Sequence, residues 1–336
     1  MAWGAAVGAM SASIEVGTAA GLRGVGSHRT LWGEGRQRVR IFSGRDLAAG
    51  EFVLLAGGCS LVAALMASLL AGRAGKLGLV SRHRRERFGV GRVPLTGGPG
   101  LLLGVLAPVA ALGLPLEAGQ WAGLGGFFLV GLVDDRRELR PAGKFLLQGV
   151  PACVASWLLV PSPVAFGFAV LLFLFLVNAC NYLDNMDGLL PGVALAQATA
   201  LALLEARAGA GATLLLLGLP GILLLNLPPA RVFLGDSGSH HVGALFALDV
   251  VGLLFDPRGA RLHFALPLAV LFALPLADVA TVTVSRLRRR RPVFRGGTDH
   301  LSHRLVRLGF PPPRAVLLLV LGTVVCGVAA LLLAHA

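Results

Sequence analysis

Apolar runs of about the length of a membrane-spanning helix recur along this chain, separated by short polar stretches. A helix needs ~20 mostly apolar residues to cross a bilayer, and the runs have that length. The predicted spans cover about residues 51–72, 95–113, 119–133, 144–160, 164–182, 188–206, 210–227, 238–255, 262–284 and 314–335. We therefore expect an all-α, polytopic integral membrane protein with about ten transmembrane helices.

The composition agrees with a membrane protein. Hydrophobic residues make up 55% of the chain and charged residues only 14%, and the mean hydropathy is +0.77. A soluble domain carries roughly 25% charged residues, which its surface requires. The net charge of +13 does not need nucleic acid as a partner, because Lys and Arg next to membrane spans attract anionic lipid headgroups. The four cysteines fall inside apolar runs and are typical of packing residues.

The basic residues are distributed unevenly between the loops. The loops after the first, third and ninth spans are rich in Arg and Lys and the loop after the seventh holds Arg231, whereas the alternate loops hold only Arg207, Arg258 and Arg261. This bias predicts that the odd-numbered loops, and any site built from them, face the cytoplasm. Residues 1–48 do not fit, because their arginines would lie on the opposite side. We expect 1–48 to be a poorly ordered or mis-assigned extension and 49–336 to be the transmembrane domain.

Acidic and amide residues collect at the predicted cytoplasmic ends of the spans, where membrane proteins rarely place them without a function. Asp134 and Asp135 end the third span, and Asp236 precedes the eighth. By itself the Asp134-Asp135 pair could cap a helix or pair with the neighbouring arginines, and Asp236 could be an N-cap. Two carboxylates at a membrane edge also suit Mg²⁺, and a helix opened by small residues binds anions. Lys144 either reaches a phosphate or extends to the membrane surface.

Two further stretches share this predicted face. The fifth span ends in polar residues that lie close to one helical face or one turn apart beside it, and they favour a polar ligand over simple packing. These residues are Asn178, Asn181, Asp184 and Asp187. The ninth loop holds His300, His303 and Arg304, which can bind phosphate or transfer protons. No cysteine is near them, so a zinc site is not favoured.

These stretches together resemble the polyprenyl-phosphate N-acetylhexosamine-1-phosphate transferase family. The likeness runs from about residue 80 to 310 with five motifs in order. They are Val93-Pro94 with Gly97-Gly98, Asp134-Asp135 with Leu139, Pro141, Lys144, Phe145 and Gln148, Asn178 to Gly188, Phe233 to Ser239, and Asp299 to Leu305. The chain departs from the family pattern at Asn185, where a glycine is common, and at Ser302, where a histidine is common. It also lacks the His-His-His-Phe stretch of the phospho-MurNAc-pentapeptide transferase branch, which favours the UDP-GlcNAc branch.

The resemblance implies that N-acetylglucosamine 1-phosphate passes from a UDP-sugar to undecaprenyl phosphate, which starts a cell-envelope glycan and releases UMP. It implies Mg²⁺ as cofactor, with Mn²⁺ as a second choice, and a multi-pass location in the bacterial inner membrane. The expected partners are the two substrates and membrane lipids, without nucleic acid, and a homodimer is left open. The implied catalytic residues are Asp134, Asp135 and Asp236, of which Asp236 and Asp135 bind the metal. The implied substrate-binding residues are Lys144, Asn178, Asn181, Asp184, Asp187, His300, His303 and Arg304.

Two other functions remain to be weighed. A transporter of a cation or sugar phosphate is compatible with many spans and intramembrane acids. However, the chain shows no internal repeat, and its acids lie at the edges of the spans. A CDP-alcohol phosphotransferase would need an Asp-Gly-x-x-Ala-Arg pattern, which the sequence lacks. Asp278, inside the ninth span, could line the lipid groove or pair with Arg286, and structural support is the favoured role.

Overall fold

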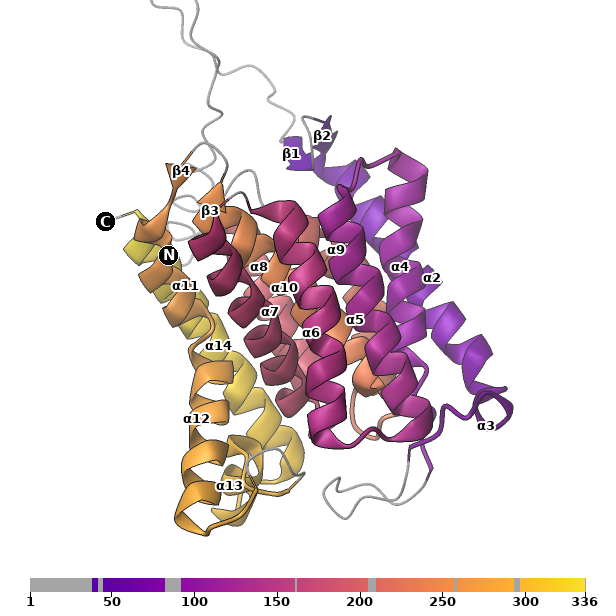
Figure 1. Cartoon of the computed structure of the whole chain (residues 1–336). Coiled ribbons are helices and arrows are strands. Elements are labelled where there is room, and N and C mark those ends of the chain that lie inside the picture. Colours follow the sequence, from indigo (N-terminus) through magenta and orange to yellow (C-terminus); the bar gives the residue numbers. More distant parts are fainter. Residues whose placement is uncertain are drawn as a thin grey trace, which may run out of the picture. The chain divides into compact units, whose positions relative to one another are not determined.

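The computed structural model describes residues 38–41, 45–81, 92–160, 162–204, 210–256, 259–292 and 297–335, and these fold into a bundle of helices (Figure 1). The longer helices are α2 (Ala49–Ala71), α4 (Gly97–Leu112), α5 (Ala118–Arg137), α6 (Pro141–Leu159), α7 (Pro163–Leu183), α8 (Leu189–Leu204), α9 (Ala210–Asn226), α10 (Gly235–Leu254), α12 (Ala273–Arg288) and α14 (Pro312–Ala334). Short helices are α3 (Ala74–Leu77), η1 (Leu262–Phe264), α11 (Ala265–Leu271) and α13 (Leu301–Arg307). The predicted all-helical class is confirmed.

Two small antiparallel strand pairs accompany the helices. Strands β1 (Arg38–Ile41) and β2 (Arg45–Ala48) pair with Arg38 opposite Ala48, and β3 (Phe255–Asp256) pairs with β4 (Gly259–Ala260). The pair β1–β2 falls in the segment expected to be a poorly ordered or mis-assigned extension. The rest of that segment, residues 1–37 and 42–44, lies outside the described residues. The proposed division of the chain at residue 48 therefore stays a prediction.

The outward faces of several helices are apolar and need a lipid environment. Leu54, Leu146, Trp157 and Leu332 are each between 69% and 78% exposed. Water-soluble surfaces do not present contiguous apolar faces of this kind. Within the described residues, four helices are long and apolar enough to cross a membrane, or five if the bent pair of η1–α11 and α12 counts as one span. The protein is therefore a polytopic membrane protein.

Each of the ten predicted spans coincides with a helix or a bent pair, but not every one of these has the length or hydropathy of an independent span. Helices α4 and α8 have 16 residues each, and α9 has 17. Helices α5 and α10 have 20 residues but carry polar ends, the first finishing at Arg137 and the second beginning at Gly235. The polar start of α10 is buried among other helices, whereas Arg136 and Arg137 at the end of α5 are exposed.

Helix α10 occupies the centre of the bundle. It packs against α4, α5, α7 and α9, and nearly all of its residues are buried. Its first turn lies in very close contact with two glycines, because a Cβ on Gly98 would meet Ser237 and a Cβ on Gly131 would meet the Asp236 backbone. Backbone hydrogen bonds from Gly97 to Phe233 and from Gly98 to Leu234, both 3.0 Å, fix the same place. The position of the Gly-Asp-Ser-Gly stretch is thus set by backbone contacts.

The segment predicted as the ninth span is broken. Helix α11 ends at Leu271, α12 begins at Ala273, and the two segments meet at an angle of 68°. Pro275 lies in the first turn of α12, where it lacks the N–H of a continuous helix. The break directs α12 away from the line of α11 and toward α13 (Figure 1).

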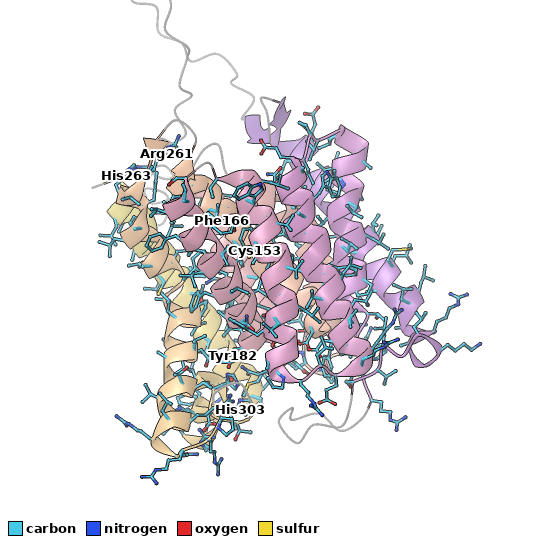
Figure 2. All side chains as sticks on the ribbon, viewed as in Figure 1. Cys153, Phe166, Tyr182, Arg261, His263 and His303 are labelled. Atoms are coloured by element: carbon cyan, nitrogen blue, oxygen red, sulfur yellow. The ribbon has the colours of Figure 1, made fainter. Side chains whose placement is uncertain are left out.

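The polar stretches of the sequence lie at one end of the bundle. The turn from α5 to α6 and helix α13 lie at the lower end in Figure 1, and the β3–β4 pair lies at the opposite end. Figure 2 places Tyr182 and His303 at the first end and Arg261 and His263 at the other. Asp249, near that other end, is buried and accepts hydrogen bonds from Gly211 and Ala212 at the start of α9 (2.8 and 2.5 Å). It caps a helix, as a packed polar residue would.

The close packing of α2 on α9 gives a test of the fold. A Cβ on Gly221 would overlap the backbone of Ser60, which cannot move without shifting a helix. We expect Gly221→Ala to lower the melting temperature in detergent by several degrees, since overpacking typically costs about 1–3 kcal/mol. Gly322→Ala is the matched control, because Gly322 has open space around its Cβ position. An unchanged melting temperature for Gly221→Ala would contradict the observed helix pairing.

Candidate active site

Two carboxylates from different helices share one ammonium group at the polar end of the bundle. The Lys144 Nζ lies 2.9 Å from Asp134 Oδ2 and 3.0 Å from Asp236 Oδ2. Asp134 comes from the last turn of α5, Lys144 from the first turn of α6 and Asp236 from the first turn of α10. The Asp134 and Lys144 side chains are only 7% and 15% exposed, so each charge depends on its partners. We refer to Asp134, Lys144 and Asp236 as the charged cluster.

Asp135 has a different environment from its neighbour. Its Oδ1 accepts the Asp236 N–H at 2.7 Å, and its Oδ2 accepts the Ser237 N–H at 3.0 Å and the Ser237 hydroxyl at 2.6 Å. A carboxylate at this place satisfies unpaired N–H groups of α10 and interacts favourably with its dipole. Asp135 therefore caps a helix that is distant in sequence, and it holds Asp236 in position.

Amide side chains from α7 line the charged cluster. Asn181 donates through Nδ2 to Asp236 Oδ1 and, at 2.9 Å, to Ser239 Oγ, and its Oδ1 lies 3.5 Å from Lys144 Nζ. One turn earlier, Asn178 donates to Gln148 Oε1 at 2.8 Å. The structure therefore brings both predicted asparagines to the same place as the aspartates.

The other two predicted acids of this stretch lie around the turn that follows α7. Asp184 is buried at the end of the helix, and Asp187 accepts the Ala230 N–H at 3.0 Å. Gly188 has a φ of +77°, which glycine adopts without strain, and its N–H donates to Asn226 Oδ1 at 2.8 Å. Asp187 thereby attaches this turn to the loop that leads into α10.

The predicted histidines form a second group on α13. His300 Nδ1 donates to Asp278 Oδ2 at 2.8 Å, and Asp278 Oδ1 accepts the Leu301 N–H at 2.7 Å. The rings of His300 and His303 lie 5.9 Å apart, and Arg304 donates through Nε to the Asp299 carbonyl. Asp278 gives the expected structural support, but its partner is His300 and not Arg286.

Arg286 pairs with Asp299 instead, at the start of the histidine loop. Asp299 accepts from the Ser285 hydroxyl at 3.0 Å and lies 3.4 Å from both Arg286 and Arg289. Partial burial alone would raise the pKa of Asp299, but the Ser285 hydrogen bond and the Arg286 guanidinium outweigh it and lower that pKa below its usual value. The carboxylate is therefore ionised and anchors the loop to α12.

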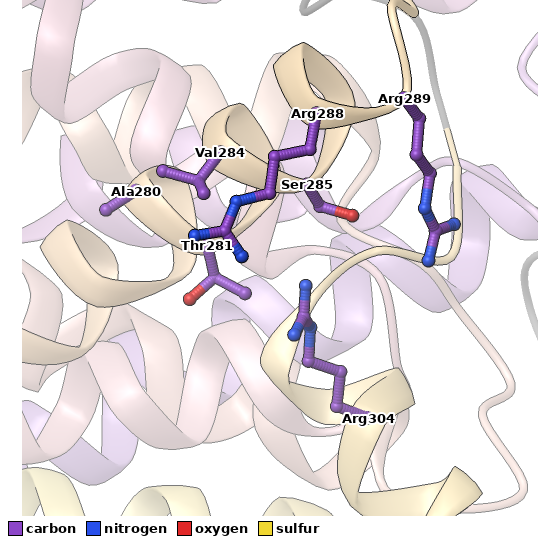
Figure 3. A pocket seen from close by; sticks show the side chains of 7 residues that line it. All are labelled: Ala280, Thr281, Val284, Ser285, Arg288, Arg289 and Arg304. Carbon is purple, nitrogen blue, oxygen red and sulfur yellow. The ribbon is translucent and has the colours of Figure 1, made fainter.

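An arginine-lined cavity opens beside this loop. It has a volume of about 450 Å³, and the guanidinium groups of Arg288, Arg289 and Arg304 surround it (Figure 3). Ala280, Thr281, Val284 and Ser285 complete its wall. Three guanidinium groups around one space form a site suited to an anion.

Tyr182 lies between the charged cluster and the histidine group of α13. It follows Asn181 directly on α7, and its ring lies edge-on to the ring of His300, with 5.5 Å between the centroids. The sequence interpretation did not select Tyr182, Ser237, Ser239 or Asp299 as functional residues. Ser237 and Ser239 lie inside the Gly-Asp-Ser-Gly-Ser stretch, so only their position in this stretch could have indicated a functional role.

The donor set of the charged cluster suits a hard divalent cation. Oxygens of Asp134 and Asp236 converge within 3.0 Å of one positive centre, the Lys144 ammonium. Mg²⁺ uses one or two protein carboxylates and completes its shell with water and substrate phosphates. Among the residues that the structure describes, no group of three or more His, Cys, Asp or Glu side chains is arranged to hold a metal alone. The cluster fits a metal that is shared with a substrate.

Comparisons with known proteins show which family this chain is similar to. Residues 118–254 match the family described as glycosyl transferase family 4. One relative is a Streptomyces coelicolor protein that is named only as a glycosyltransferase. It is 35% identical to this chain, and the match covers 82% of this chain and 68% of that protein. The decaprenyl-phosphate N-acetylglucosaminephosphotransferase of Mycobacterium tuberculosis is 30% identical over 74% of each chain. The undecaprenyl-phosphate alpha-N-acetylglucosaminyl 1-phosphate transferase of Escherichia coli K12 is 25% identical over 73% of this chain and 74% of its own.

The three hydrogen bonds of Asp135 generate a stability prediction. Asp135→Asn places an amide donor against backbone N–H groups, so we expect a loss of about 1–3 kcal/mol, measured as a lower melting temperature without substrate. Ser237→Ala, the comparison variant, removes only one of the three bonds and should cost less. If Asp135→Asn has the same melting temperature as the wild-type protein, Asp135 does not hold the start of α10.

Proposed function

Because this chain belongs to glycosyl transferase family 4, we propose that it joins N-acetylglucosamine 1-phosphate, taken from UDP-N-acetylglucosamine, to undecaprenyl phosphate. At the level of the family it is an enzyme, a polyprenyl-phosphate sugar-1-phosphate transferase. The names of the E. coli and M. tuberculosis relatives support N-acetylglucosamine as the sugar. The enzymatic assignment replaces the transporter that the sequence left open.

The proposed reaction exchanges one phosphoanhydride bond for another. An oxygen of the lipid phosphate bonds to the phosphorus that carries the sugar, and the bond from this phosphorus to the bridging oxygen of UMP breaks. UMP leaves with that bond's electrons, and the product is undecaprenyl-diphospho-N-acetylglucosamine. Because both reactants are anions, the protein must supply positive charge and hold the phosphates in line.

The charged cluster is the observation that carries this proposal. We assign Asp236 as the principal metal ligand, with Asp134 or Asp135 assisting. The geometry favours Asp134 as the second ligand, since Asp135 is engaged with α10. Bound Mg²⁺, or Mn²⁺ in its place, would neutralise the diphosphate and stabilise the departing UMP.

Lys144, Asp134 and the two asparagines of α7 are assigned to the phosphates and the sugar nucleotide. Lys144 presents a positive charge between the carboxylates, where it can hold a phosphate oxygen. Asp134 orients or deprotonates the lipid phosphate. Asn181 holds the Asp236 carboxylate, and Asn178, which donates to Gln148, is assigned with it to the substrate.

The histidine group of α13 and the turn after α7 are assigned the remaining substrate contacts. His300, His303 and Arg304 are assigned to the phosphates of the nucleotide, beside the arginine-lined cavity. Asp184 and Asp187, at the end of α7 and in the turn after it, are assigned to the nucleotide or the sugar. Tyr182 lies between this group and the charged cluster, which supports one substrate site extending across both.

We further propose a location in a bacterial inner membrane with ten transmembrane helices and the site facing the cytoplasm. The uneven distribution of Arg and Lys between the loops supports this orientation. The gathering of the polar stretches at one end of the bundle supports a site open to a soluble nucleotide sugar. A homodimer is compatible with the proposal and is not required by it.

The assignment of Asp236 can be tested with purified protein. We expect Asp236→Asn to lower UMP release by roughly 100-fold or more, since a metal contributes several kcal/mol of charge stabilisation. The assay contains UDP-N-acetylglucosamine, undecaprenyl phosphate and Mg²⁺. Glu117→Gln, at the other end of α5, is the control and should keep full activity. Full activity of Asp236→Asn would exclude its role as principal ligand.

The donor is tested in the same assay by exchanging the nucleotide sugar. We expect UMP release with UDP-N-acetylglucosamine to exceed release with UDP-N-acetylgalactosamine by tenfold or more at equal concentration, about 1.4 kcal/mol of discrimination. Omission of undecaprenyl phosphate should abolish UMP release. Preference for another UDP-sugar would replace the proposed donor and leave the family assignment intact.

A further inference from the structure

A second polar layer lies one helical turn deeper in the bundle than the charged cluster. Each of its members is one turn away from Lys144, Asn181 or Asp236 on the same helix. They are Gln148 of α6, Asn178 of α7 and His240 of α10, and we call these three residues the inner layer. Gln148 and His240 are 0% exposed, whereas Asn178 is partly exposed. Neither of the two buried members has a role in the proposed function.

The hydrogen bonds of the inner layer determine the orientation of both amide side chains. Asn178 Nδ2 donates to the Leu174 carbonyl at 2.7 Å and to Gln148 Oε1 at 2.8 Å. A carbonyl can only accept, so the Leu174 contact fixes which end of the Asn178 amide is the NH2 group. The atom of Gln148 that faces this NH2 group must then be its oxygen. The NH2 group of Gln148 therefore points the other way, toward His240.

The same argument determines where the proton of His240 lies. Gln148 Nε2 is 3.2 Å from His240 Nε2. Because an amide NH2 group can only donate, the ring nitrogen accepts and carries no hydrogen. The neutral ring of His240 therefore holds its proton on Nδ1. A ring protonated at Nε2 would place two N–H donors against each other and lose this bond.

We propose that Gln148 and His240 are positioning residues for Asn178, and that they leave its carbonyl oxygen as the atom that meets the substrate. Both hydrogens of the Asn178 amide are used within the protein, and among the described residues no donor is bonded to its Oδ1. This oxygen accepts a hydrogen bond, so its substrate partner is a hydroxyl or an N–H group. The inference rests on the proposed function for the contact of Asn178 with a substrate.

Only one of the two substrates offers such a partner. The ionised phosphate of the lipid has acceptor oxygens alone, whereas the nucleotide sugar carries hydroxyl groups and the N–H groups of its acetamido and uracil parts. We therefore expect the inner layer to affect binding of the nucleotide sugar and not binding of the lipid. A role in stability alone would show no such preference.

Nitrogen-15 NMR of the full-length protein, labelled at its eight histidines, tests the hydrogen-bond chain directly. We expect His240, identified by the loss of its signals in His240→Gln, to show the Nδ1–H tautomer. Asn178→Asp places a carboxylate, which can only accept at alkaline pH, next to Gln148. Gln148 should then turn its NH2 group to this carboxylate and its oxygen to His240, so the ring should switch to the Nε2–H tautomer. His241, equally buried on α10 but outside the inner layer, is the internal control and should keep its tautomer.

Steady-state kinetics provide the functional readout. We expect His240→Leu to raise the KM for UDP-N-acetylglucosamine about fivefold, because Gln148 loses its acceptor and no longer holds Asn178. The KM for undecaprenyl phosphate should stay that of the wild type. His240→Gln offers an oxygen acceptor in place of Nε2 and should retain both wild-type values. His241→Leu is the matched control, since the His241 ring packs against Phe128 of α5, and it should also retain both.

The outcomes separate this inference from the proposed function. An Nε2–H tautomer of His240 in the wild-type protein, or no switch in Asn178→Asp, would overturn the hydrogen-bond chain. Unchanged KM values in His240→Leu, or equal increases for both substrates, would overturn the positioning role. If His240→Leu fails to fold, Asn178→Ala decides the question, because it removes the oxygen itself at a partly exposed position. A tautomer switch in a protein that releases no UMP would sustain the hydrogen-bond chain and refute the proposed function.

Discussion

One buried ammonium group shared by two carboxylates organises the polar end of this protein. Charges of this kind cannot stay unpaired at the edge of an apolar bundle, and removing one partner of a buried pair typically costs about 3–5 kcal/mol. Asp134, Lys144 and Asp236 come from α5, α6 and α10, so their mutual neutralisation requires the three helix ends to meet. The requirement that stabilises the fold is also what creates a centre able to hold phosphate charge.

The other residues of the site lie at increasing distances from this ammonium group. Asn181 contacts the cluster directly, and Asp135 secures the start of α10 from behind. Tyr182 then leads to the α13 histidines, which Asp278 and Ser302 orient from two sides. Each polar group near the centre has a partner that fixes its direction, which is what a preorganised site needs.

Much of this could be predicted from the chain, and the limits have physical causes. Hydropathy located every long helix, and the joint position of Asp134, Asn181 and Asp236 followed from the expectation that the odd loops share one face. The sequence could not distinguish the roles of Asp134 and Asp135, because the partners of Asp135 lie about 100 residues away on α10, and Lys144 connects Asp134 to Asp236 on the same helix. Tertiary contacts likewise decided that Asp278 supports His300. The hydrogen bond between Ser302 and Asn185 was also beyond sequence reasoning, which treated them as unrelated substitutions.

The close glycine contacts around α10 distinguish a rigid part of the molecule from the helices beyond the break. At Gly98 and Gly131 backbone meets backbone, so α4, α5 and α10 cannot slide or tilt against one another without a steric clash. Close-packed backbone contacts of this kind resist deformation. Helices α12 and α13, by contrast, follow the 68° break. Helix α12 packs against α7 and α14, and α13 packs against α14 and contacts the turn after α7 through Ser302 and Asn185. The carboxylates are thus carried by a framework of helices locked together by backbone contacts, whereas the histidines are carried by elements that join this framework across the break.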